Sequence, residues 1–157
     1  VGLGNSPIVG EFLVFTKDLC PECAAGDIDF AWNGDGRWDI RIQAVQCPVG
    51  DTTIQYAFQG SNQWYIKLQV RNARIPITSL ELKKGKDWVT PKHTLDGYWE
   101  VMNQGEWPAG PINVRMTAAN GEVLNDVIPK IETDSTVIMD GFNKVQVSFD
   151  NSLPHFP

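Results

Sequence analysis

The sequence lacks the patterns that define several protein classes. No apolar run approaches the roughly 20 residues that cross a bilayer, so we expect no membrane-spanning helix. No segment carries a sustained helical stripe of apolar residues, which argues against an α-helical core. Basic residues are scarce: 13 lysines and arginines oppose 19 acidic residues, and the formal charge of −6 argues against nucleic acid as a partner. With 157 residues, 42% of them apolar, the chain has room for one ordinary domain or two small ones.

Catalytic and cofactor motifs are also missing. The sequence has no phosphate-binding loop, and no Ser/His/Asp or Cys/His set that would activate a nucleophile. Its two histidines, His93 and His155, lie in polar stretches next to prolines, a setting typical of solvated surface positions. We therefore predict no cofactor and no bound metal ion.

Cysteine is rare, with residues at positions 20, 23 and 47. Cys20 and Cys23 form a Cys-x-x-Cys motif, but the second half of a zinc site is absent, and the residues that follow do not begin a helix well, as a redox pair would require. We therefore expect a structural disulfide that joins either Cys20 or Cys23 to Cys47. Such a bond indicates an oxidising compartment.

Alternation of period two dominates the chain from about residue 49 onward. Within Trp64–Arg71 the even-numbered side chains are apolar and the odd-numbered ones mostly polar, which is typical of an antiparallel strand with one buried and one solvated face. A change of parity at Thr78–Ser79 predicts a bulge, and Asn120-Gly121 predicts a hairpin. Further strands are expected over Thr53–Phe58, Asp87–Thr90, Gly97–Met102, Ile112–Ala118 and Lys144–Phe149.

The strands predict an all-β protein in two parts. Seven or eight short strands at this spacing predict a β-sandwich over about residues 49–149. Residues 1–48 contain two expected strands, Val9–Thr16 and Trp38–Val45, around an acidic, glycine-rich stretch. Two or three strands do not bury a core alone, so this part is expected to pack on the sandwich, on another chain or on further sequence.

Two carboxylates bracket the close cysteines. Asp18 and Asp29 stand eleven residues apart around a tight loop, and a pair of this kind can serve as acid and base for a glycosidic bond. In the alternative interpretation, Asp18 caps a turn, Asp27 is solvated and Asp29 accepts backbone hydrogen bonds. The spacing alone favours the alternative.

Aromatic residues form the second candidate site. The chain has six tryptophans and three tyrosines, including the adjacent pairs Trp64-Tyr65 and Tyr98-Trp99. Strand parity turns Tyr65 outward and Trp64 inward, and it turns Tyr98 outward. Exposed rings on a sheet suit flat sugar rings, while polar neighbours bond the hydroxyls. The expected polar neighbours are Lys67, Gln69 and Arg71; Trp88, Trp99 and Trp107 are expected in the core or in turns.

Four ordered segments resemble the expansins, in particular the microbial expansin-like proteins. The run Thr16–Asp29 is similar to the Thr-Asp-Leu-x-Pro…Gly-x-x-Asp-Leu segment of that family. The run Trp64–Asn72 is similar to the strand that carries the aromatic platform of the family's C-terminal domain. Ile112–Thr117 and Val127–Lys130 follow in matching order. The resemblance covers roughly residues 9–149.

The resemblance implies a fold and a function. Residues 1–48 would be part of a double-psi β-barrel, and residues 49–157 an immunoglobulin-like sandwich that binds cellulose or related cell-wall glucans. The protein would be secreted and would loosen polysaccharide without hydrolysis. Asp18 and Asp29 match the two cleft aspartates, and Trp64 and Tyr65 match two of three platform positions. The third position falls on Asp96, so Tyr98 is a shifted candidate.

Three functions follow from these observations. The first is a secreted expansin-like protein that binds a β-glucan. The second is a structural expansin-fold module in an extracellular assembly, because an incomplete barrel exposes strand edges to a partner chain. The third, ranked last, is a glycosidase that uses Asp18 and Asp29.

Overall fold

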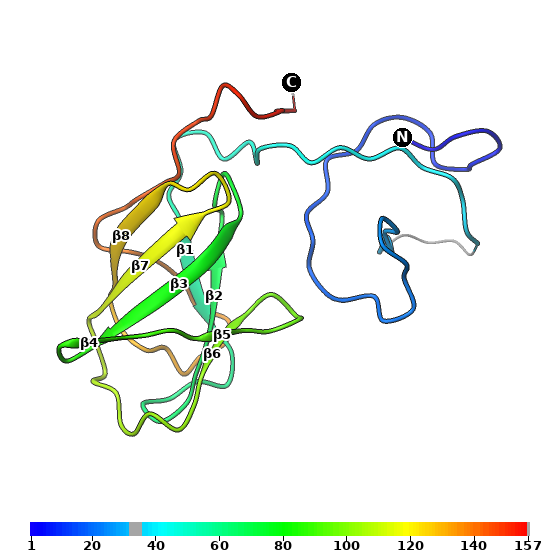
Figure 1. Cartoon of the computed structure of the whole chain (residues 1–157). Coiled ribbons are helices and arrows are strands. Elements are labelled where there is room, and N and C mark those ends of the chain that lie inside the picture. Colours follow the sequence, from blue (N-terminus) through cyan, green and yellow to red (C-terminus); the bar gives the residue numbers. More distant parts are fainter. Residues whose placement is uncertain (32–35, 157) are drawn as a thin grey trace.

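The computed structural model describes residues 1–31 and 36–156, and its strands form a sandwich of two antiparallel sheets (Figure 1). One sheet has the strand order β5-β6-β2-β1-β9 and the other has the order β4-β3-β7-β8. The expected all-β class and two-sheet sandwich are confirmed. The strands are β1 (Gln55–Phe58), β2 (Ile66–Arg71), β3 (Ile77–Lys84), β4 (Asp87–Val89), β5 (Lys92–His93), β6 (Trp99–Val101), β7 (Ile112–Ala118), β8 (Val123–Ile128) and β9 (Ile138–Asp140).

The core lies between the two sheets and follows the period-two pattern. Ile66 and Leu68 of β2 are fully buried, as are their counterparts Leu80 of β3 and Met116 of β7. Successive side chains of a strand point to opposite faces, so one face of each sheet supplies the core and the other faces water. Burial of each large apolar side chain contributes about 1.5–3 kcal/mol, which makes the sandwich the stable part of the chain.

The predicted hairpin and bulge are both present. Strands β7 and β8 pair from Thr117 opposite Val123 to Ile112 opposite Ile128. The turn between them places Gly121 at a φ of 89°, a left-handed conformation that favours glycine. In β3 the pairing with β7 shifts register between Ile77 and Ser79, which is the position of the expected bulge.

The prediction of a strand over Lys144–Phe149 is wrong. Val145 and Val147 do face the core, and Val147 is fully buried, but side-chain bonds replace the ladder of a strand. The side-chain oxygen of Gln146 accepts hydrogen bonds from the backbone N–H groups of Arg74 and Val147. The side-chain nitrogen of Gln146 donates to the backbone carbonyl oxygens of Thr52 and Asn72. The short strands β5 and β9 were not expected from the sequence.

The described residues of the N-terminal 48 form no strand, so the strands expected over Val9–Thr16 and Trp38–Val45 are corrected (Figure 1). A single antiparallel bridge joins Gly2 to Ile40. It stays isolated because the described part of this segment has no neighbouring strand that would extend it into a ladder. An extended segment of this kind is consistent with part of a barrel. The division of the chain into domains at residue 48 stays a prediction. Many of the segment's large apolar side chains are exposed, including Val9, Leu13, Val14, Phe15, Leu19 and Trp38.

The disulfide differs from the expected pairing. Cys20 bonds to Cys23, and Cys47 is a free thiol. The two bonded cysteines share one tight turn, in which the N–H of Cys23 donates to the carbonyl of Cys20. Cys47 is held elsewhere, because its N–H donates to the carbonyl of Arg74 at the sandwich. Among residues 1–31 and 36–156, no helix has the length and apolarity needed to cross a bilayer.

Candidate functional site

Trp64 lies in a tight turn just before β2, and its side chain is 62% exposed. The side-chain oxygen of Asn62 closes this turn by accepting the N–H groups of Trp64 (2.8 Å) and Tyr65 (3.0 Å). Strand alternation begins only at Ile66, so it does not govern Trp64. The expectation from parity that Trp64 points inward is therefore wrong, and the outward position implied by the expansin resemblance is correct.

Tyr65 is held at its hydroxyl by a carboxylate of the neighbouring strand. The phenol donates a hydrogen bond of 2.6 Å to Oε2 of Glu100 in β6. This bond is the main reason that the pKa of Tyr65 is raised to about 12, and partial burial and the charges of Glu100 and Asp96 add to it. The ring of Tyr65 is half-buried, with its edge fixed by Glu100.

Lys67 connects β2 to the loop between β5 and β6. Its ammonium lies 2.7 Å from the carboxylate of Asp96 and 4.8 Å from the centre of the Tyr98 ring. The hydroxyl of Thr94 donates to the other oxygen of Asp96. Hydrogen bonds from Lys67 and then Thr94 lower the pKa of Asp96 below its ordinary value. The structure thus brings Tyr98, two residues beyond the expected third position, beside the side chain of Lys67.

Gln69 and Arg71 continue the outward row along β2. The Arg71 guanidinium donates through Nε to the Gln69 side-chain oxygen at 2.5 Å. Tyr65 and the outward side chains of β2 are therefore bonded to protein groups: Tyr65 to Glu100, Lys67 to Asp96, and Gln69 to Arg71. We call Trp64, Tyr65, Lys67 and Tyr98 the aromatic row. A hydrogen bond to Glu100 holds the ring of Tyr65. The ammonium of Lys67, paired with Asp96, lies over the ring of Tyr98. These contacts limit the motion of both side chains before a ligand binds.

The other tryptophans take different positions. Trp99 and Trp107 are buried, as expected. Trp88 is half-buried and lies opposite Lys83 in the strand pair β3–β4. Leu82 faces the core, so the next residue, Lys83, and its partner Trp88 lie on the outer face of the four-stranded sheet. The guanidinium of Arg115 covers it at 4.4 Å from the ring centre. Because cations cover its ring, Trp88 presents less flat surface than Trp64.

The two candidate aspartates of the N-terminal part are exposed. Asp18 accepts the backbone N–H of Leu19, the residue that follows it. Asp29 lies near Glu22 and the sulfur of Cys20, with their ligand-type atoms within 4.8 Å of one another. That sulfur is in a disulfide, so it is not a thiolate that could bind a metal ion. No hydrogen bond or ion pair of the described residues joins Asp18 to Asp29, and their catalytic role stays a prediction.

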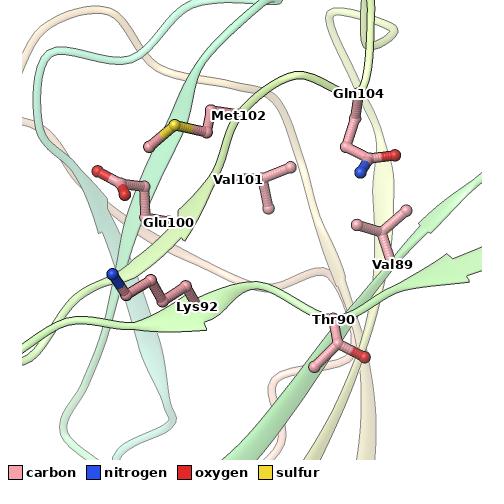
Figure 2. Close-up of a pocket in the computed structure, with 7 residues that line it drawn as sticks. All are labelled: Val89, Thr90, Lys92, Glu100, Val101, Met102 and Gln104. Carbon is pink, nitrogen blue, oxygen red and sulfur yellow. The ribbon is translucent and has the colours of Figure 1, made fainter.

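A shallow pocket of about 350 Å³ lies beside Glu100 (Figure 2). Sequence reasoning missed it, because it forms where the end of β4, strand β5 and the segment after β6 meet, and no single motif marks that junction. Its lining residues are Val89, Thr90, Lys92, Glu100, Val101, Met102 and Gln104.

The fold and the exposed ring of Trp64 place this protein among all-β sandwiches that carry aromatic side chains on one sheet. Comparison with known proteins shows which of these it is similar to. No protein-family model matches the chain. The chain is 30% identical to Expansin-YoaJ of Bacillus subtilis (strain 168) over 135 residues, which are 81% of this chain and 57% of that protein. The chain thus spans little more than half the length of this curated relative. Over most of its length, the chain is therefore similar to the expansins.

Two solved structures are also similar. They are crystal structures of a Clavibacter michiganensis expansin, one without ligand and one of a mutant in complex with cellohexaose. The identities are 29% and 30%, and in both cases the match covers 60% of this chain and 45% of that chain with a TM-score of 0.48.

Proposed function

We propose that this protein acts outside the cell, binding cellulose or a related cell-wall glucan through the aromatic row and loosening it without hydrolysis. The observation that carries the proposal is the exposed ring of Trp64 next to Tyr65, with Tyr98 drawn to the same row by Lys67. The C–H faces of glucose rings pack on such rings, while the donors of Gln69 and Arg71 that their mutual bond does not use offer hydrogen bonds to hydroxyls. Neutral glucan needs no basic protein, so a charge of −6 is compatible with this ligand.

Two further observations support the proposal. The curated relative is an expansin by name, and the match to it includes most of this chain. The disulfide between Cys20 and Cys23 fits an oxidising compartment such as the cell exterior.

Retention on microcrystalline cellulose tests the proposal. A Trp64→Ala/Tyr65→Ala double variant should lose about tenfold or more in affinity, because two stacking rings are removed. Trp88→Ala is the matched control, since it removes a ring of the same kind from the opposite sheet and should leave retention unchanged. Unchanged retention of the double variant would show that the aromatic row is not the binding surface. Release of reducing sugar from soluble glucan would contradict the absence of hydrolysis.

A second candidate is a structural module in an extracellular assembly. It is favoured by the apolar side chains exposed in the N-terminal part, including Val9 and Phe15, each 81% exposed. Size-exclusion chromatography of the natural material separates the two candidates. A defined complex with a second polypeptide and no retention on cellulose would favour the module, and a monomer that binds glucan would favour the first candidate.

A further inference from the structure

Glu100 belongs to two sites at once. Its carboxylate accepts the hydroxyl of Tyr65 in the aromatic row, and its side chain also lines the pocket at the end of β6 (Figure 2). The pocket therefore begins one side chain away from the edge of the Tyr65 ring. A polysaccharide lying on that ring passes the mouth of the pocket.

The pocket has an apolar floor. Val89 comes from the end of β4 in one sheet, and Val101 comes from the end of β6 in the other. Figure 2 shows Val101 near the centre of the pocket, with Met102 beside it. Val101 is 4% exposed, whereas Met102 is 49% exposed and presents its flexible thioether to the opening. Such a surface suits the C–H face of a sugar ring.

The polar groups at the rim have no protein partner. Within the described residues, the ammonium of Lys92, the hydroxyl of Thr90 and the side-chain amide of Gln104 make no hydrogen bond or ion pair. The outward groups of β2 are already bonded to protein, as with Lys67 and Asp96 at 2.7 Å. Hydroxyls of a ligand bound on this side therefore find uncommitted donors and acceptors in the pocket. This contrast was not visible from the sequence, which pointed to β2 for that role.

We propose that the pocket is a subsite for one neutral pyranose carried as a branch on the glucan that the aromatic row binds. This inference rests on the proposed function, and it narrows the substrate class to branched glucans. One ammonium and one carboxylate line the pocket, so its net charge is zero and it does not favour an acidic sugar. Its volume of about 350 Å³ lies at the small end of the range for ligand pockets, which suits one ring better than an oligosaccharide.

Calorimetric titration with three sugars tests the subsite. The probes are cellohexaose, a cello-oligosaccharide of equal backbone length with single pyranose branches, and the free branch monosaccharide. The wild-type protein should bind the branched probe about five- to tenfold more tightly than cellohexaose, because it adds hydrogen bonds and apolar contact in the pocket. The free monosaccharide should bind too weakly to detect, because it lacks the anchorage of the backbone on the aromatic row.

Two substitutions localise the effect. Lys92→Met keeps most of the length of the side chain but removes its donors, and Thr90→Tyr fills the pocket. Both should abolish the preference for the branched probe while binding of cellohexaose stays at the wild-type value. Lys86→Met, in the exposed turn between β3 and β4, is the matched control and should keep the preference.

The outcomes separate the two claims. Equal binding of the branched and linear probes by the wild-type protein would overturn the subsite and leave the proposed function standing. A preference that survives both pocket substitutions would also overturn it, because the branch would then be bound elsewhere. Loss of binding to every probe by the wild-type protein would overturn both claims. Tight binding of the free monosaccharide would show an independent sugar site and would overturn the branch assignment.

Discussion

The bond between Tyr65 and Glu100 makes the most direct prediction from this structure. Replacing Glu100 with glutamine keeps an oxygen that can accept the phenol but removes the negative charge. The pKa of Tyr65 should then fall from about 12 toward its ordinary value of 10.0, because the carboxylate's hydrogen bond is the largest cause of the increase and its charge adds to it. A change of two pKa units is a hundredfold change in the acid dissociation constant of the phenol.

The assay is an ultraviolet difference titration of phenolate formation. Each variant is compared with the same variant carrying Tyr65→Phe, so that the difference isolates this residue from Tyr56 and Tyr98. Burial raises the pKa of Tyr56 far above the titrated range, which keeps that residue silent. Glu106→Gln is the control, because Glu106 is an exposed carboxylate with no hydrogen bond or ion pair among the described residues.

The same bond sets the direction of an effect on stability at high pH. The folded pKa of Tyr65 lies above the unfolded value, so the bond stabilises the folded state fully below pH 10.0 and loses this contribution as the pH rises to about 12. The difference in unfolding midpoint between wild type and Glu100→Gln should therefore shrink across that interval. An unchanged titration of Tyr65 in Glu100→Gln would refute the role assigned to this carboxylate.

Four other predictions follow from the structure. Tyr56→Phe should destabilise the fold by about 1–3 kcal/mol in urea unfolding, because the buried Asp126 carboxylate loses the 2.9 Å hydrogen bond from the Tyr56 hydroxyl. Gly141→Ala should destabilise the fold by at least as much, because the added Cβ would lie 1.8 Å from an Asp126 side-chain oxygen. Gln146→Ala should cost about 2–4 kcal/mol by the same measurement, because four backbone groups lose their partner. A thiol-reactive dye should label one cysteine, Cys47, before reduction and three after it.

The sequence determined much of the sandwich by itself. Alternation along Ile66–Arg71 and Ile112–Ala118 identified the buried side chains, because a strand has a fixed period and one face must be dry. The parity change near Thr78 and the Asn120-Gly121 pair located the bulge and the hairpin, because both depend on local backbone geometry.

Tertiary structure decided the rest. Trp64 is exposed because Asn62 closes a turn before β2 begins, and a period-two pattern does not show where a strand starts. The partner of Tyr65 lies 35 residues away on β6, and the pocket beside it joins segments from both sheets. Such contacts depend on which strands become neighbours, and that choice is made by the packing of the whole sandwich rather than by any local run of residues.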